Sequence, residues 1–455
     1  MKNDKKTMME NLAHEANDRG LFTGTWLYAD HGEIVSKGAV GWRDPEDRLP
    51  MREDSLFDLA SVSKNFTATA VMLLRKRGLL RLEDEITKFF PEIPYKGVTI
   101  RHLLNHTGGL PDYMDWITKA AEDENTIPGN EIIIRFLCEC GEEPSFAPGD
   151  QFEYSNTGYC LLAQIVEKVS GVPFEAFMQQ NVFEPAGMLS TRVIHRRRDR
   201  LAPENLAYGL VLSHGKYVLP DNTTDDGHCV VPLDGMNGDG IVHTNIFDLL
   251  CWDRACRNGT LLTDAEQEMM YTPGKLNSGE DSGKDDEGGA VGYGFGWDVF
   301  ADEKLGRIVG HSGGWPGYSI WYERFLDSDR VLAILCCRES RDDRGAESFR
   351  AAMRAVARDQ EPEPIRCIED LALEHPDRIG WDDLCGIYAW RDYRIEVFLR
   401  DGDLYAAFHT ETERDDDPSR LYPLRDKVFG IRGNSGDIRF GNDGLTFYGE
   451  TGRKL

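Results

Sequence analysis

The chain lacks several features that would place it in a broad class of proteins. Its 52 lysines and arginines stand against 79 aspartates and glutamates, and the net charge of −27 should repel nucleic acid and anionic membranes. No apolar run reaches the length of about 18 residues that a membrane-spanning helix needs. The N-terminal segment has no apolar core of signal-peptide length. We therefore expect a cytoplasmic protein that binds neither nucleic acid nor membranes.

The ten cysteines are scattered and follow no recognised framework. The two close pairs, Cys138/Cys140 and Cys336/Cys337, lack the spacing of zinc ligands. Because no secretion signal is evident, we expect all of the cysteines to be reduced thiols. We expect neither a metal nor a cofactor.

A length of 455 residues is too great for one ordinary hydrophobic core, so the chain should form two or more domains. In the first 360 residues, strand patterns at both ends enclose a series of amphipathic helices. This order is typical of an α+β fold in which an antiparallel sheet is flanked by helices, with an all-helical lobe. Strands are expected within residues 24–44 and 291–337, and helices at 59–74, 98–110, 155–171, 244–259 and 345–359.

The pattern changes after Glu361–Ile365, which has the composition of a linker. Beyond this segment, short alternating strands are joined by Asp-Gly turns at Asp401-Gly402 and Asp443-Gly444. We expect residues 1–360 to form one domain and residues 366–455 a separate all-β domain, either a lipocalin-like barrel or a sandwich. Its role stays open between shaping a substrate entrance and stabilising or assembling the protein.

Ser61 and Lys64 stand one helical turn apart at the start of a predicted helix. A serine hydroxyl is a weak nucleophile that needs a nearby base, and a lysine at i+3 can supply one if it is desolvated. The N–H groups at a helix N-terminus can also bind an oxyanion. Alone, Ser-x-x-Lys is a weak signal, because a capping serine beside an exposed lysine gives the same pattern. Ser63 is a second hydroxyl, but it lacks the i, i+3 relation to Lys64.

Two later segments strengthen the hypothesis of a serine nucleophile. Tyr154-Ser155-Asn156 immediately precedes a long predicted helix, so Tyr154 could share a proton with Lys64 and Asn156 could hydrogen-bond a substrate. The segment Gly310–Tyr318 offers a polar strand edge with small residues, against which a substrate backbone could lie. Taken singly, each segment has an ordinary structural explanation, as a capping aromatic residue and a sheet histidine.

The three segments together, in this order and with flanking words such as "LLNHTGGLPDY" and "YGFGWDV", resemble the penicillin-recognising serine hydrolases. The most similar branch is the class C β-lactamase-like group, with D-alanyl-D-alanine carboxypeptidases, D-aminopeptidases and family VIII esterases. The resemblance covers about residues 15–358. It implies a β-lactamase/transpeptidase-like fold and a small-molecule or short-peptide substrate, and it leaves the oligomeric state unknown.

The resemblance also implies catalytic roles. The serine of the family's first motif is the acylated nucleophile and corresponds to Ser61. The motif's lysine, a proton partner, corresponds to Lys64. The tyrosine of the second motif, a general base that later protonates the leaving group, corresponds to Tyr154. The oxyanion hole of the family carries over to the backbone N–H groups of Ser61 and Gly314.

Substrate-binding positions are assigned in the same way. Asn156 corresponds to the asparagine that orients substrate, and His311, Ser312 and Gly313 form the third motif. Many β-lactamases carry Lys-Thr-Gly there, and a histidine offers less fixed positive charge near neutral pH. His106 matches a loop motif regarded as structural, so we leave it out of the predicted site.

The predicted activity is hydrolysis of an amide or ester bond through an acyl-enzyme on Ser61. A D-amino-acid-containing peptide or a small ester is the expected substrate. A β-lactamase is the alternative within the enzyme class. A penicillin-binding sensor or a non-catalytic binding protein is the alternative of another class.

Overall fold

The computed structural model divides into two compact units. The larger consists mostly of Thr23–Val211 and Tyr217–Glu339, and the smaller mostly of Ser340–Leu455 with Met8–Phe22. The sequence predicts that residues 1–360 and 366–455 fold as separate domains. Whether each folds independently stays a prediction. The structure describes residues 2–44, 48–114, 116–117, 127–213, 216–223, 229–285, 289–391, 393–410, 418–432, 434–441 and 443–455.

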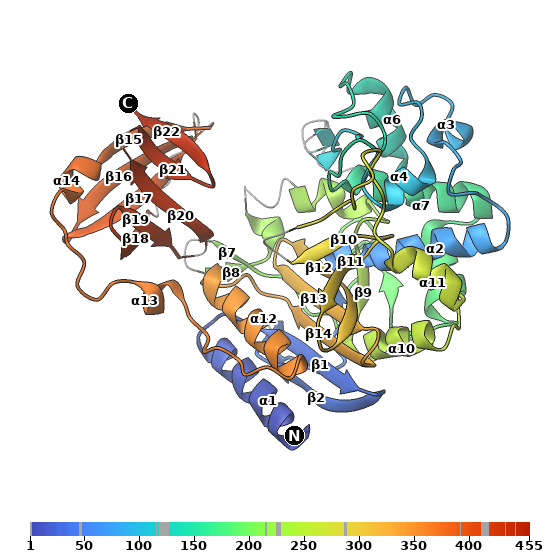
Figure 1. Ribbon diagram of the computed structural model, residues 1–455, viewed down its shortest axis with the longest axis horizontal. Helices are drawn as coiled ribbons and strands as arrows, with labels where there is room; N and C mark the ends of the chain where they lie inside the picture. Colours follow the sequence, from blue (N-terminus) through green and yellow to red (C-terminus); the bar gives the residue numbers. More distant parts are fainter. Residues whose placement is uncertain are drawn as a thin grey trace. The chain divides into compact units, whose positions relative to one another are not determined.

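A seven-stranded antiparallel sheet forms the centre of the larger unit (Figure 1). Its strand order, β10-β11-β12-β13-β14-β1-β2, places the N-terminal hairpin beside the last strand, with Trp26 opposite Ile334. The predicted antiparallel sheet built from both ends of this region is thereby confirmed. The strands are β1 (Gly24–Asp30), β2 (Glu33–Val40), β10 (Ala290–Tyr293), β11 (Asp298–Asp302), β12 (Gly306–Trp315), β13 (Tyr318–Phe325) and β14 (Arg330–Cys336).

Helices of the middle segment form the predicted lobe, in which α3, α4, α6 and α7 gather away from the sheet (Figure 1). Helix α2 runs into this lobe and is buried at every residue from Ser63 to Leu74, so it is a core helix with no solvent face over that length. The helices of this unit are α2 (Ser63–Lys76), α3 (Ile86–Phe89), α4 (Ile100–Leu104), α6 (Glu131–Glu139), α7 (Asn156–Ser170), α8 (Phe174–Met178), α10 (Ile246–Arg257) and α11 (Asp264–Tyr271).

Several predicted helix ends are correct because local capping decides them. The Thr99 side chain accepts a hydrogen bond from His102 N, and Ser155 caps α7 by accepting from Gly158 N. Gly171 ends α7 in the left-handed conformation, at φ 75°. The helix expected to end at the Gly108-Gly109 turn is shorter than predicted and ends at Leu104.

A small three-stranded sheet, ordered β5-β9-β6, flanks the start of α2. Its pairing sets Asp58 opposite His243, and so joins the residues just before Ser61 to a segment far along the chain. The remaining short elements of this part are β3 (Trp42–Asp44), β4 (Leu49–Pro50), β5 (Phe57–Asp58), η1 (Ala60–Val62), η2 (Gln179–Phe183), β6 (Arg192–Val193), β7 (Val211–Ser213), β8 (Lys216–Val218), η3 (Pro220–Asn222), η4 (Pro232–Gly235) and β9 (Val242–Thr244).

The C-terminal strands close into an eight-stranded antiparallel barrel, which decides between the predicted barrel and sandwich in favour of the barrel. Its core contains Trp390, Ile395, Phe429 and Phe447, all buried. The barrel strands are β15 (Gly386–Trp390), β16 (Tyr393–Arg400), β17 (Asp403–His409), β18 (Ser419–Arg425), β19 (Val428–Ile431), β20 (Asn434–Gly441), β21 (Gly444–Phe447) and β22 (Glu450–Lys454).

The other helices are α1 (Lys2–Asp18), α12 (Asp343–Ala357), α13 (Ile368–Leu371) and α14 (Trp381–Leu384). Among the described residues, no helix has both the length and the apolarity needed to cross a membrane. All ten cysteines are free thiols.

Candidate active site

Ser61 lies in a strained turn between β5 and α2. The predicted helix begins here as the 3₁₀ turn η1, Ala60–Val62, and becomes α-helical only at Ser63. Ala60 has a left-handed backbone with φ of 45°, and its N–H donates to Asp58 Oδ1 at 2.8 Å. Because a non-glycine residue in this region is unfavourable, surrounding contacts must hold the turn in place. Ser61 therefore has a fixed position beside the helix N-terminus.

Lys64 is fully buried, and its ammonium group is held by three acceptors. Its Nζ donates to Ser61 Oγ at 3.2 Å, to Asn156 Oδ1 at 2.8 Å and to the Asp239 carbonyl oxygen at 2.9 Å. Three contacts account for all three N–H bonds of an ammonium group. The structure thus brings the predicted nucleophile and its amine into direct contact, with Asn156 beside them.

The segment Gly238–Val242 packs along one face of α2. Thr67 Oγ1 donates to the Gly238 carbonyl at 2.7 Å, and Val242 N donates to Ser63 Oγ at 3.1 Å. Ser63, the rival hydroxyl, is thus buried and used in structure. Ile241 has φ of 57°, which is rare for a β-branched residue, so this segment is strained as well. Its Asp239 carbonyl is placed against Lys64 by these contacts.

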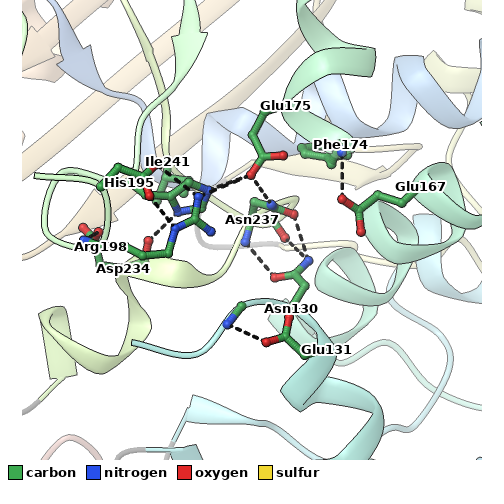
Figure 2. Close-up of polar contacts among 12 residues, drawn as sticks. Asn130, Glu131, Glu167, Phe174, Glu175, His195, Arg198, Asp234, Asn237 and Ile241 are labelled. Atoms are coloured by element: carbon green, nitrogen blue, oxygen red, sulfur yellow. Dashed lines mark hydrogen bonds and ion pairs between the residues drawn. The ribbon is translucent and has the colours of Figure 1, made fainter. Parts of the chain in front are cut away.

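A polar network holds the residues that immediately precede Gly238–Val242 (Figure 2). The His195 ring contacts the Asp234 carbonyl oxygen at 2.6 Å and Glu175 Oε1 at 2.9 Å. Both partner atoms are oxygens that can accept from a ring N–H group. Asn130 Nδ2 donates to the Asn237 carbonyl at 2.8 Å, and Asn237 N donates to Asn130 Oδ1 at 2.8 Å. Figure 2 shows these groups converging on residues 234–237, just before the strained segment.

Glu175 is the acidic member of this network. The hydrogen bond from His195 lowers the pKa of its carboxyl group to about 2, although burial opposes the shift. Arg198 lies 3.7 Å away and adds a second positive charge. The carboxylate is therefore ionised throughout the neutral range, where it accepts the hydrogen bond from the His195 ring.

Tyr154 lies just before α7, with its ring toward Lys64. The Lys64 Nζ is 4.8 Å from the centroid of the Tyr154 ring. The centroids of the Tyr154 and His106 rings are 4.4 Å apart. Among the described residues, the Tyr154 hydroxyl makes no hydrogen bond to Ser61 or Lys64. His106 Nδ1 accepts from Ser155 N at 3.1 Å, so this buried histidine supports the backbone between Tyr154 and Asn156.

Strand β12 presents the third predicted motif. The His311 ring is buried, with Nε2 2.9 Å from Tyr293 Oη, and Nδ1 lies 2.5 Å from the carbonyl oxygen of Ser312. Burial, aided by the charge of Lys64, lowers the pKa of His311 to about 3, so the ring is neutral. Ser312 is exposed on the other face of the strand. The His311 side chain thus contacts the protein interior, and its role as a substrate ligand stays a prediction.

Glycines let β12 approach the nucleophile. A Cβ atom at Gly313 would lie 2.2 Å from the Leu59 carbonyl oxygen, so only glycine fits there. At Gly314 a Cβ atom would meet nothing within 4 Å, because this position faces open space. Strand β11 pairs with β12 only as far as Gly310, so among the described strands no partner covers the other edge of His311–Trp315. A substrate backbone could pair with that edge.

A cavity of about 240 Å³ lies between these elements. It brings three of the predicted site residues together, Ser61, Asn156 and Gly314. Lys64 does not line the cavity but contacts Ser61, which does. Its walls combine apolar side chains with two carboxyl groups. They are formed by Asp58, Ala60, Ser61, Tyr113, Met114, Asn156, Leu233, Met236, Asp239, Gly240, Ile241, Gly314 and Trp315.

Sequence reasoning missed Asp239 and the Glu175–His195 pair. Asp239 contributes a backbone carbonyl, which any residue type could supply, so its side chain gave no signal. Glu175 and His195 are 20 residues apart, and both are ordinary residues of polar segments. No periodic pattern or motif spacing could have joined them.

One cluster outside the cavity has metal-ligand atoms close together. Within the part of the chain that the structure describes, Asp342, Cys367 and Glu369 have ligand atoms that lie within 4.8 Å of one another. Asp342 already accepts from Gly345 N and Ile368 N, as a helix cap does. The Cys367 thiol contacts Arg19 at 2.9 Å, and burial raises its pKa, which opposes metal binding as a thiolate.

Comparison with known proteins shows the family of this chain. The family model described as Beta-lactamase matches residues 9–357. The chain belongs to the β-lactamase family. Penicillin-binding protein 4* of Bacillus subtilis (strain 168) is 41% identical over 344 residues, which cover 74% of this chain and 73% of that protein.

Two further relatives extend the comparison of this β-lactamase-family chain. Esterase EstB of Burkholderia gladioli is 34% identical over 198 residues, which are 41% of this chain and 50% of the esterase. The octameric penicillin-binding protein homologue from Pyrococcus abyssi has a TM-score of 0.65 at 22% identity and covers 98% of each chain. That likeness extends the shared fold beyond the family match to the C-terminal barrel.

Proposed function

We propose that this protein is a serine hydrolase that forms an acyl-enzyme on Ser61 and cleaves an amide or ester bond of a small molecule or short peptide. The observation that carries the proposal is the 3.2 Å contact between Lys64 Nζ and Ser61 Oγ at the wall of a substrate-sized cavity. The expected substrates are D-amino-acid-containing peptides and small esters. The names of the relatives, a penicillin-binding protein and an esterase, support this range.

In the proposed reaction, Ser61 Oγ attacks the carbonyl carbon of the substrate and its proton passes to Lys64. Tyr154 lies beside Lys64 and shares in the proton transfer. Lys64 in its free-base form accepts through the contact with Ser61, and the Tyr154 ring lies beside the same nitrogen. Asn156 holds Lys64 through Oδ1 and donates one amide N–H to Met114 Sδ at 3.5 Å, which leaves its other N–H for a substrate in the cavity.

The negative charge that develops on the carbonyl oxygen needs preorganised donors. We assign these to the N–H groups of Ser61 and Gly314, which both border the cavity. Collapse of the tetrahedral intermediate breaks the bond to the leaving group, which takes a proton from Tyr154. Tyr154 is reprotonated by Lys64, which received the proton from Ser61. Water then attacks the acyl-enzyme by the same route in reverse.

The alternative functions differ from the proposal at the acylation step or after it. A β-lactamase would hydrolyse a β-lactam, and a penicillin-binding sensor would acylate but hold the acyl group. A non-catalytic binding protein would not acylate at all. The neutral, buried His311 gives no positive charge for a β-lactam carboxylate, which favours the amide or ester hydrolase.

A substrate panel separates these possibilities. We would measure kcat/KM for p-nitrophenyl esters, for D- and L-amino-acid amides, and for nitrocefin, and would follow acylation by intact-protein mass spectrometry. The proposal expects turnover of an ester or amide at least about tenfold faster than that of nitrocefin. Nitrocefin turnover that exceeds every other rate would assign a β-lactamase, and a stable penicilloyl adduct without turnover would assign a sensor.

A further inference from the structure

The cavity at Ser61 is lined by acidic groups as well as apolar ones. Among the lining residues that the structure describes, two carry carboxyl groups, Asp58 and Asp239, and none is a lysine, arginine or histidine. Asp58 is deeply buried, and burial raises the pKa of its carboxyl group, although His243 opposes the shift. Asp239 is partly exposed and accepts from Tyr113 Oη at 2.8 Å. Burial, followed by the charge of Asp239, raises the pKa of Tyr113 well above its ordinary value, so the phenol stays a neutral donor.

The nearby cation has no donor left for an anionic substrate group. The three N–H bonds of the Lys64 ammonium group are directed to Ser61 Oγ, Asn156 Oδ1 and the Asp239 carbonyl oxygen. When Lys64 gives up a proton to act as a base, the positive charge disappears altogether. A carboxylate on the substrate would therefore meet the carboxyl group of Asp239 and, among the described lining residues, no cationic side chain.

The third motif, His311-Ser312-Gly313, adds no positive charge to the site. His311 is neutral at physiological pH, and its two ring nitrogens contact Tyr293 and the Ser312 carbonyl. The net charge of −27 adds a long-range field of the same negative sign. All of these observations disfavour a substrate with a carboxylate beside the scissile bond and favour a cation there.

We propose that the cavity selects substrates that carry a protonated amine close to the scissile carbonyl, with the Asp239 carboxylate as the counter-ion. This inference rests on the proposed function and names the substrate class within it: amides or esters of an amino acid or peptide with a free amino terminus. Asp239 suits the role because its own backbone carbonyl is one hydrogen bond from Lys64, which in turn contacts Ser61. An amine bound at its carboxylate would thus lie close to the nucleophile.

The remaining walls describe the side chain that accompanies the amine. Met114, Leu233, Met236, Ile241 and Trp315 give the cavity an apolar lining. Burial of an apolar side chain against them contributes about 25 cal/mol per Å². The preferred acyl group is therefore an aminoacyl group with an apolar side chain.

The test compares three substrates that differ in the group on the α-nitrogen and so in the charge there. Alanine, N-acetylalanine and N-succinylalanine derivatives are cationic, neutral and anionic there, and each is followed as a p-nitroanilide and as an ethyl ester, in D and L forms. In the wild-type protein we expect kcat/KM to fall in that order, by about tenfold or more from the free amine to the N-acetyl compound, the range of a hydrogen-bonded ion pair.

Asp239→Asn keeps the backbone carbonyl for Lys64 and an oxygen for Tyr113, and removes only the charge. We expect this variant to lose most of the preference for the amine over the N-acetyl compound, chiefly through KM. The matched control is Asp264→Asn, which removes one exposed carboxylate from the first turn of α11, outside the cavity. It should keep the wild-type ratio.

The inference is wrong if the N-succinyl substrate is preferred or if the ratio is equal in the wild type and Asp239→Asn. In either case Ser61-dependent hydrolysis of p-nitrophenyl acetate would leave the proposed function standing. Absence of any acylation of Ser61 would contradict the proposed function and, with it, this inference.

Discussion

Residues other than glycine adopt the left-handed backbone conformation both in the C-terminal barrel and around Ser61. The two sets occupy different kinds of local structure. In the barrel they occupy the hairpin turns between neighbouring strands, where such a conformation matches the twist of the strands. A polar or flexible side chain there faces solvent, and the sequence marks some of these turns with Asp-Gly. The barrel residues are Arg391, Asp401, Lys427 and Tyr448.

Around the nucleophile the same conformation occurs at Ala60, His106 and Ile241, at φ values of 45°, 58° and 57°. Two of these residues line the cavity, and the third supports the backbone before Asn156. None of the three lies in a two-residue hairpin. The comparison indicates that strain in the barrel serves chain reversal, whereas strain near Ser61 is held by tertiary contacts that position reacting groups.

The largest expected effect comes from the proton-transfer groups of the site. Lys64→Ala and Tyr154→Phe should each lower kcat/KM by about two orders of magnitude or more, as loss of a general acid or base does. Because the groups act as a unit, the double variant should lose much less than the product of the two single losses. Steady-state kinetics on one ester tests this. A strictly multiplicative loss would contradict a shared proton path.

Glu175→Gln should have the next largest effect, because it leaves His195 with a weaker acceptor behind the cavity wall. We expect a loss of about 1–3 kcal/mol in the free energy of unfolding, as for a disrupted buried charged hydrogen bond. Turnover should fall with it, since residues 234–239 position Lys64. Glu131→Gln, which removes an exposed carboxylate from α6, is the control and should change stability by less than about 0.5 kcal/mol.

The pH dependence of this effect has a defined sign. The pKa of Glu175 is about 2 in the folded protein against 4.5 as its reference value. Its contribution to stability is therefore complete above pH 4.5 and is lost as the pH falls toward 2. Urea unfolding should show the wild type and Glu175→Gln converging over that window. A difference that is constant with pH would mean that the carboxylate charge is not what matters.

His311 gives a second pH-dependent effect, which begins at a higher pH. Its pKa is about 3 in the folded protein and 6.5 as the reference value, because burial favours the neutral ring. The stability linked to the neutral ring is complete above pH 6.5 and is lost as the pH falls toward 3. His311→Gln, which cannot take up a proton, should therefore show a weaker fall in Tm between those values than the wild type. Parallel Tm curves would contradict a buried neutral histidine.

The smallest effects test the comparison of strain itself. Lys427→Gly, in a barrel hairpin, should stabilise the protein by up to about 1 kcal/mol and leave ester turnover unchanged, since glycine suits the left-handed region. Ala60→Gly should give a similar gain in stability but lower kcat, because it loosens the turn that carries Ser61. If both variants change stability alone, the strain at Ala60 has no part in positioning the nucleophile.

The parts of this fold that local sequence decides were predictable. Thr99, Ser155 and Gly171 mark helix ends through contacts within a few residues, and the barrel hairpins alternate with a period of two. The spacing of Ser61 and Lys64 predicted their contact for the same reason. The resemblance of three short motifs then indicated that Asn156 and β12 would join them.

The rest of the site depends on contacts between distant segments. The Asp239 carbonyl reaches Lys64 across 175 positions, and the Asn130–Asn237 pair spans 107. The burial of His311 behind Tyr293 likewise arises only when β10 and β12 lie in one sheet. The position of His311 could be predicted from the third motif. Its neutral charge and inward orientation could not, because burial is a property of the assembled core.

The central claim is that Ser61 is the residue that becomes acylated. The most direct measurement is intact-protein mass spectrometry after reaction with a fluorophosphonate, with peptide mapping of the modified residue, on the wild type and Ser61→Ala. We predict one adduct on Ser61 in the wild type and none in the variant, whose melting temperature should be close to that of the wild type. An adduct of equal yield in Ser61→Ala, or one that maps to Ser63, would contradict the account.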